Sequence, residues 1–384
     1  FFVLSGYLIT ALLLREYEST GRIRYVRFLA RRLRRLLPAL LVMLATVSLF
    51  GMVLLSEYEL RIQSGSFVYA ATWTSNLFFA LSQFDYFSPL QARDLYLHTW
   101  SLGVEEQFYL VWPLLIYAGH RALTRRDGAV VDHGRFVAIL AAVAAGSLAL
   151  SLYWSQTQAL LAFYSMPTRA WQFALGALIA LMPGRQLLAD LVGRFGGLAA
   201  WTGLVMIMGS VVFLHRQLPY PGVYALLPSA GAALVIAAGS RSGGVNDVLT
   251  NRWLVWLGDR SYSVYLWHWP LIILLAGVGF GGGIPRIIAI SALSVVLATI
   301  SYRWVELPFW KGELGRFPPA RAILVSILGV VVLVGGVGEA HRLHYGEDIA
   351  RGFAIDYDAR ADRPSIYAGG CDTWYSNAEV IPCA

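Results

Sequence analysis

The chain has 384 residues, of which 57% are hydrophobic and only 14% are charged, and its formal net charge is +7. Ordinary soluble domains carry about 25% charged residues, so this composition argues against a soluble globular domain. With a mean hydropathy of +0.58, it indicates a polytopic membrane protein. The positive charge is divided among several loops rather than gathered on one basic face, so we expect no nucleic acid partner.

Ten apolar stretches are candidates for membrane-spanning helices. A helix needs about 20 mostly apolar residues to cross the hydrocarbon of a bilayer. The windows that approach this length, some of them loosely, are Phe1 to Leu14, Leu37 to Ser56, Trp100 to Gly119, Phe136 to Trp154, Arg169 to Met182, Trp201 to Leu214, Val223 to Gly239, Ser261 to Val278, Ile284 to Trp304 and Ala322 to Gly338. The sequence therefore predicts an all-α fold, a polytopic transmembrane helical bundle with about ten spans.

The basic loops predict the orientation, because Lys and Arg concentrate in the cytoplasmic loops of membrane proteins. With ten crossings all basic segments fall on one side. They are Arg15 to Arg35, His120 to Arg135, Arg185 to Arg194, Arg241 to Arg252 and Lys311 to Arg321. We therefore expect a multi-pass protein of the plasma (inner) membrane whose C-terminal tail is extracytoplasmic.

One further segment, Phe67 to Leu81, is apolar enough to be counted as a span. A full crossing there would reverse the sidedness of every later basic loop. We interpret the segment as interfacial or re-entrant on the outer face, because the basic loops then stay together.

The polar tail, residues 339–384, cannot span a membrane and follows a predicted membrane domain of residues 1–338. It contains both cysteines of the chain, Cys371 and Cys383. Two cysteines confined to an extracytoplasmic segment predict a disulfide, which contributes roughly 3 kcal/mol for so short a loop; two free thiols are the alternative. The sequence starts without Met, charged leader or cleavage site, and stops directly after Cys383, so we expect further chain at both ends.

A run of arginines follows the first apolar stretch and is ended by Pro38. Arg27, Arg31 and Arg34 or Arg35 recur at helical spacing and form one cationic stripe. Guanidinium forks bind phosphate with two parallel hydrogen bonds, so the stripe is a candidate site for a phosphorylated cytoplasmic ligand. An anchor that follows the positive-inside rule and contacts anionic membrane lipid has the same pattern, and charge alone favours this anchor.

Two adjacent acids, Glu105 and Glu106, lie inside an aromatic and apolar run. A carboxylate at membrane depth costs about 2.5 to 3.5 kcal/mol, which makes it a candidate functional residue. On a helix Glu105 aligns with Tyr109 and Trp112, whereas Glu106 points about one residue step around the axis. We expect only Glu105 to face the interior, where it can orient a base or carry a proton. A structural partner for a buried arginine, or an acid near the outer interface, is the alternative.

A polar face is predicted on the helix that contains Ser261, Tyr265 and His268, with a bend at Pro270 just beyond the histidine. A lone histidine on an aromatic face is more often a packing residue. The neighbouring serine and tyrosine make a polar cluster the alternative.

Three further charged residues occur near the ends of apolar stretches. Arg303 and Glu306 are three residues apart and are expected to pair, most simply as a structural ion pair. Arg169 begins a short glycine-containing helix, and its role as a structural or a functional residue is likewise left open. The chain has no Gly-rich phosphate loop, zinc-site spacing or Gly-x-Ser-x-Gly elbow, so no metal is expected. The residues alone leave enzyme and transporter open.

At these motifs the chain resembles the acyltransferase-3 family of integral membrane O-acyltransferases, in particular members with a fused extracytoplasmic SGNH domain. The matching segments occur in the family's order: Phe1 to Thr10, Arg31 to Pro38, His98 to Leu110, Ser261 to His268 and Ser301 to Pro308. The tail from Cys371 to Cys383 resembles the linker that leads to an SGNH domain, which would lie outside this chain.

The resemblance implies an O-acetyltransferase that moves an acyl group, usually acetyl, from cytoplasmic acyl-CoA to a hydroxyl of an exported glycan. The acceptor would be of the lipopolysaccharide, peptidoglycan or exopolysaccharide class. Arg31, Arg32 and Arg35 would bind the coenzyme A phosphates, and Glu105 and His268 would be catalytic. The supporting polar core would comprise Trp100, Ser101, Tyr109, Arg169, Ser261, Tyr265, Arg303 and Glu306.

Two features depart from the family pattern. The family's main catalytic histidine lies on a first helix that this chain does not contain, and Gln172 stands where many members have a glutamate. A proton-coupled transporter or flippase of a glycan or acyl compound is the alternative function, with the buried acids as its proton relay. A scaffold that only anchors the expected C-terminal domain is a third interpretation.

Overall fold

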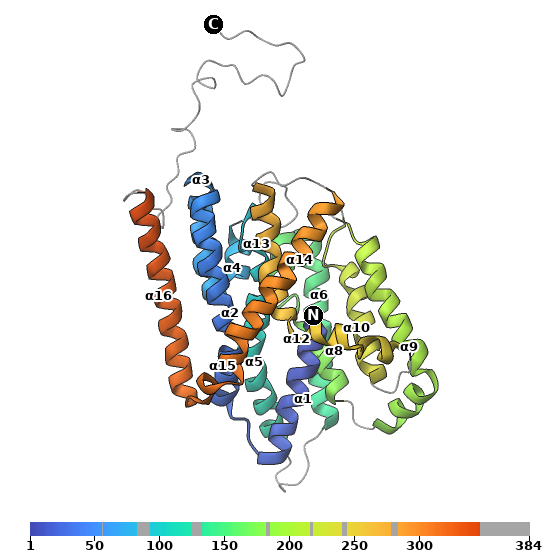
Figure 1. The fold of residues 1–384 in the computed structure, drawn as a ribbon. Helices are drawn as coiled ribbons and strands as arrows, with labels where there is room; N and C mark the ends of the chain where they lie inside the picture. The colour runs from blue at the N-terminus through green and yellow to red at the C-terminus, as the bar shows by residue number, and fades with distance from the viewer. Residues whose placement is uncertain are drawn as a thin grey trace, which may run out of the picture. The chain divides into compact units, whose positions relative to one another are not determined.

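The computed structural model describes residues 1–55, 57–82, 93–123, 133–181, 185–215, 218–239, 244–277 and 283–345 (Figure 1). Within these ranges the chain is helical and contains no strand, so the all-α prediction is confirmed. The chain divides into two units, Phe1–Val337 and Gly338–Ala384. Cys371, Cys383 and the disulfide predicted between them lie outside the described residues.

The first unit is a bundle of helices (Figure 1). The helices of more than ten residues are α1 (Phe2–Thr20), α2 (Tyr25–Leu54), α3 (Glu57–Ala71), α5 (Trp100–Leu123), α6 (His133–Thr157), α8 (Ala170–Leu181), α9 (Arg185–Phe213), α10 (Leu226–Ala238), α13 (Ser261–Gly277), α14 (Ile284–Ser301) and α16 (Pro319–Tyr345), the last of which ends in the second unit. The short helices are α4 (Ser75–Leu81), α7 (Ala159–Tyr164), α11 (Val245–Leu249), α12 (Arg252–Asp259) and α15 (Leu307–Trp310). Short 3-10 helices lie at Leu97–Thr99 (η2), Val223–Ala225 (η3) and Glu313–Arg316 (η6).

Several of these helices support a multi-pass membrane protein. Five are long and apolar enough to cross a bilayer: Tyr25–Leu54, Gly134–Thr157, Phe195–Phe213, Ile284–Trp310 and Pro319–Leu343. Three shorter apolar helices are Ala170–Leu181, Val223–Ala238 and Ser261–Ala276. Length and composition therefore do not confirm the expected count of about ten spans. Phe67 to Leu81 is not one continuous helix, because α3 ends at Ala71 and the chain turns through Trp73 (φ 57°) before α4. Its interpretation as an interfacial or re-entrant segment stays a prediction.

Helices α1 and α8 pack with their backbones in direct contact. A Cβ atom on Gly6 of α1 would overlap the main-chain carbonyl of Phe173, and one on Gly176 of α8 would overlap that of Val3. The two backbones therefore touch directly, the kind of approach that glycine permits between helices in lipid. This contact fixes α1, which carries functional candidates near both of its ends.

A π-turn, η5 (Tyr302–Glu306), joins α14 to α15. Such turns hold one extra residue in a helical ladder and occur often at functional sites. Here the turn leaves Arg303 exposed and buries Glu306.

Candidate functional site

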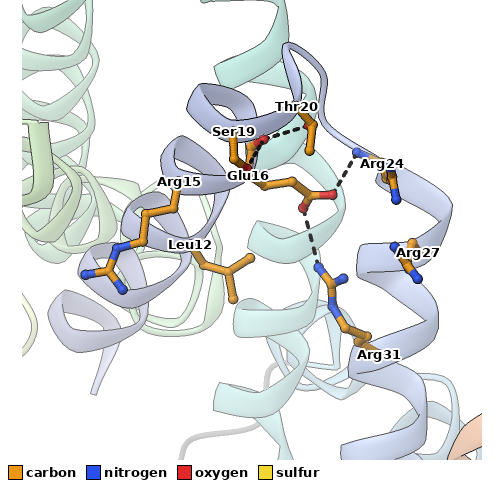
Figure 2. Close-up of a pocket in the computed structure, with 8 residues that line it drawn as sticks. All are labelled: Leu12, Arg15, Glu16, Ser19, Thr20, Arg24, Arg27 and Arg31. Carbon is orange, nitrogen blue, oxygen red and sulfur yellow. Dashed lines mark hydrogen bonds and ion pairs between the residues drawn. The ribbon is translucent and has the colours of Figure 1, made fainter.

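A cavity of about 430 Å³ opens between the end of α1 and the start of α2 (Figure 2). Its lining residues are Leu12, Arg15, Glu16, Ser19, Thr20, Arg24, Arg27 and Arg31. Four of these eight residues are arginines, so the cavity is suited to an anion. Its volume falls within the range of about 300 to 1,000 Å³ that is typical of small-molecule sites.

The turn between α1 and α2 builds this cavity. Gly21 ends α1 in the left-handed conformation (φ 67°) and its N–H donates to the carbonyl of Tyr17, a glycine helix end. The chain can therefore reverse within four residues, and α2 begins at Tyr25. Glu16 of α1 then accepts the main-chain N–H of Arg24 at 3.4 Å and lies 3.5 Å from Nη2 of Arg31.

The three arginines predicted to act together point to three different places. Arg31 lines the cavity, whereas the guanidinium of Arg32 lies 4.6 Å from the ring centre of Tyr109. That of Arg35 lies 4.7 Å from the ring centre of Trp310. Only one of the three predicted phosphate ligands is therefore in the cavity. Arg24 and Arg27, which belong to the same run of arginines, also line it, and Arg15 was missed.

A buried polar centre surrounds Glu105 on α5. Its Oε1 accepts hydrogen bonds from the hydroxyls of Ser5 and Tyr109, and Arg32 acts on it electrostatically. The predicted alignment of Glu105 with Tyr109 and Trp112 is thus confirmed, because Nε1 of Trp112 donates at 2.8 Å to the hydroxyl of Thr10, which lies on α1 like Ser5.

Glu106 differs from the sequence expectation. Its side chain is 7% exposed and that of Glu105 is 6% exposed, so both acids are buried and the prediction that only one faces the interior is wrong. The reason is that other helices surround α5 at this level, so two faces of the helix are covered. Oε1 of Glu106 has no hydrogen-bond partner among the described residues.

A second polar centre lies where α13 meets η5. The hydroxyl of Ser263 donates to Oε1 of Glu306, and the hydroxyl of Tyr262 donates to the carbonyl of Leu36 at 2.7 Å. Arg303 and Glu306, both within the described residues, do not form the predicted ion pair. The π-turn leaves Arg303 exposed and buries Glu306. Sequence reasoning therefore chose the wrong partner for Glu306 and missed Tyr262 and Ser263.

A third polar group connects α13 with the start of α5. The hydroxyls of Tyr265 and Ser101 lie 2.8 Å apart, and Nδ1 of His268 lies 2.7 Å from the carbonyl of Tyr265. Because a carbonyl only accepts, Nδ1 is the donor in this contact, and in the neutral ring Nε2 then carries the lone pair. The predicted Tyr265 and His268 are thus brought together, but Ser261 is exposed at the helix start. His98, whose ring centre lies 5.7 Å from that of His268, was missed, although it directly precedes the Thr-Trp-Ser motif.

Arg169 is a fully buried cation, with only 1% of its surface exposed. Its Nε and Nη2 donate to the carbonyl of Phe163 at 3.1 and 2.9 Å. The guanidinium carbon also lies 5.2 to 5.6 Å from the ring centres of Trp100, Phe163 and Tyr220. Aromatic faces attract a desolvated cation, and the described residues supply no acidic partner. The ring of Trp100 thus belongs to the surroundings of Arg169.

Arg169→Lys is expected to lower the thermal stability of the protein by about 1.5 kcal/mol, because lysine cannot make the forked contact to one carbonyl while it stacks among three rings. The measurement is the temperature at which the purified protein in detergent loses its monodisperse peak. Arg303→Lys, the same change at an exposed position, should leave that temperature unaltered. Equal temperatures for both variants would show that the fork is unimportant.

Within the described ranges no three His, Cys, Asp or Glu side chains gather in a group that could hold a metal ion.

The chain is similar to known acyl-transferring proteins. The sequence profile of a family described as an acyltransferase domain matches residues 1–303. O-acetyltransferase OatA of Staphylococcus aureus strain NCTC 8325 / PS 47 is 30% identical over 373 residues, which cover 90% of this chain and 59% of that protein. OatA of strain MRSA252 is 30% identical over 371 residues, with the same coverage. The chain thus spans about three fifths of the length of these relatives. No solved structure gives a significant match.

Proposed function

The chain belongs to the acyltransferase-3 family that its motifs resemble, and we propose that it is a membrane O-acyltransferase that acts on exported glycans of the cell envelope. In the proposed reaction the thioester bond of acetyl-CoA breaks and an ester bond forms to an acceptor hydroxyl. The hydroxyl proton leaves with the coenzyme A thiol. The relatives named O-acetyltransferases support acetyl as the transferred group, and peptidoglycan, one of the acceptor classes that the resemblance implies, is the first acceptor to test.

The observation that carries the proposal is the arginine-lined cavity between α1 and α2 (Figure 2). Four guanidinium groups and one carboxylate give it a surplus of positive charge, which suits the phosphates of an acyl-CoA. We assign donor binding to Arg31 together with Arg15, Arg24 and Arg27. Arg32 and Arg35 are assigned to the path from the cavity toward the buried acids.

The distance between the cavity and Glu105 also fits this donor. Ser5, which bonds Glu105, and Glu16, which lies in the cavity, are both on α1 and are separated by 11 residues. At 1.5 Å per residue they are about 16 Å apart along the helix. An extended phosphopantetheine arm covers a distance of this order, so phosphates in the cavity place the thioester near Glu105.

Glu105 and His268 are assigned to proton movement. We assign Glu105 to orienting the base that takes the acceptor proton, since a buried carboxylate held by two hydroxyls has a fixed direction. Nε2 of His268 is a second proton acceptor near Ser101 and Tyr265. Trp100, Arg169 and Glu306 are assigned to support, by holding the helices that carry these groups.

The proposed topology follows the basic loops. Ten crossings of the plasma membrane place the cavity on the cytoplasmic side, where acyl-CoA is available, and the tail outside. We propose that residues 1–338 form the membrane acyltransferase domain and that residues 339–384 link it to an SGNH-type domain, with a disulfide between Cys371 and Cys383.

Arg31→Ala in the full-length protein is expected to raise the KM for acetyl-CoA about tenfold and to change kcat little, because the residue contacts the donor phosphates and not the reacting atoms. The effect should shrink at high salt, which screens charges. Acetyl transfer to peptidoglycan fragments measures both constants.

Arg252→Ala is the matched control, since Arg252 is exposed on α12 and does not line the cavity. It should leave the KM unchanged. Equal KM values for both variants would contradict the donor site. Uptake or flipping of a glycan without any acyl donor would instead favour the transporter.

A further inference from the structure

Glu16 is the carboxylate in a cavity whose lining also contains four arginines (Figure 2). Its two oxygens point toward α2, where one accepts the main-chain N–H of Arg24 and the other lies beside Nη2 of Arg31. Arg15 and Arg27 line the same space. Glu16 therefore neutralises part of the positive charge that a bound anion would use.

The place that Glu16 occupies is suited to an external anion. Arg24 is the N-cap of α2, a helix of 30 residues. Free N–H groups and the macrodipole at such an end attract negative charge. Arg31 adds a guanidinium fork that binds phosphate through two hydrogen bonds. The carboxylate thus uses the same donors that a phosphate group would need.

The contacts of Glu16 are easily exchanged. Both distances, 3.4 and 3.5 Å, are longer than the range of about 2.7 to 3.2 Å that is usual for N–H···O hydrogen bonds. The side chain of Arg31 is 43% exposed, and ion pairs open to solvent contribute little to stability. An incoming phosphate with more charge than one carboxylate can therefore displace Glu16 without disturbing the helices.

We infer that Glu16 is an internal competitor for a phosphate group of the acyl donor and leaves Arg31 when the donor binds. This inference rests on the proposed function for the identity of the donor. Coenzyme A keeps its phosphates after acyl transfer, so the same competition lowers the affinity of the product. Glu16 thereby favours release of coenzyme A.

The test compares Glu16→Gln with Glu18→Gln in the full-length protein. Glu18→Gln removes the same charge two residues away, but Glu18 is exposed and does not line the cavity. Dissociation constants are measured for acetyl-CoA, S-acetyl-pantetheine and inorganic pyrophosphate at low and high salt. Glu16→Gln is expected to bind acetyl-CoA and pyrophosphate about fivefold more tightly, the factor that corresponds to one exposed ion pair. S-acetyl-pantetheine has no phosphate and should bind as in the wild type.

A double-mutant cycle with Arg31→Gln separates competition from helix packing. If Glu16 competes at Arg31, the gain from Glu16→Gln should shrink when Arg31 is absent. Unchanged or weaker pyrophosphate binding by Glu16→Gln would overturn the inference, as would an equal gain from Glu18→Gln. Tighter pyrophosphate binding without any binding of acetyl-CoA to the wild type would support the role of Glu16 and refute the proposed donor instead.

Discussion

Glu105→Gln is expected to reduce acetyl transfer by the full-length protein at least about 100-fold, the lower end of what a group engaged in proton transfer contributes. Glutamine preserves the volume of the side chain, but it cannot carry the charge that faces Arg32. Its NH2 group also offers donors where Ser5 and Tyr109 already donate. The measurement is the rate of acetyl transfer from acetyl-CoA, with donor affinity determined separately so that binding and chemistry are not confused.

Glu106→Gln is the comparison for this prediction. It makes the same change at the next residue, which is buried to the same degree but whose Oε1 has no hydrogen-bond partner among the described residues. A loss of no more than about tenfold is expected, because no fixed hydrogen-bond geometry is removed. If both variants lose equal activity, the loss reflects the removal of any buried charge in this region, and the specific role assigned to Glu105 is refuted.

Gly176→Ala is expected to destabilise the membrane domain by at least about 3 kcal/mol, the upper end of the usual cost of overpacking. The added methyl group would overlap the main-chain carbonyl of Val3. A backbone atom cannot rotate aside as a side chain can, so α1 and α8 must separate. The shift should appear as a lower temperature for the loss of monodisperse protein in detergent. Activity should fall with it, because α1 carries Ser5 and Glu16.

Gly146→Ala supplies the control for the glycine prediction. Gly146 lies within α6, and a Cβ atom there would meet no other atom within 4 Å. Alanine is favoured over glycine in a helix by about 1 kcal/mol, so this variant should be as stable as the wild type or slightly more stable. A Gly176→Ala protein as stable as Gly146→Ala would mean that the helices do not touch as described.

Much of the helical fold could be predicted from hydropathy, because a continuous run of about 20 apolar residues is itself the signal of a membrane helix. Patterning also located Glu105 and Tyr109 on one helix face. It could not show that Glu106 is buried too, since the burial of a second face depends on which helices pack around α5. The arginines show the same limit. Their spacing predicted a stripe, whereas the partners of Arg31, Arg32 and Arg35 come from three different helices.

The prediction for Glu306 failed for a different reason, because the backbone conformation determines the partner of this side chain. Its spacing from Arg303 predicted a pair on the assumption of a regular helix. The π-turn interrupts the regular helix, and the residue types of Tyr302 to Glu306 do not predict such a turn. Only the tertiary contact with Ser263 identifies the partner.

The number of residues in this π-turn also determines the direction of the side chains that follow it. One extra residue rotates everything after it by about 100° relative to a regular continuation of α14. The direction of Glu306 toward Ser263 and the position of Trp310 beside Arg35 both follow from that rotation. This segment can therefore accept many substitutions more readily than a single deletion, because a deletion would restore an ordinary helix and point every later side chain to a new neighbour.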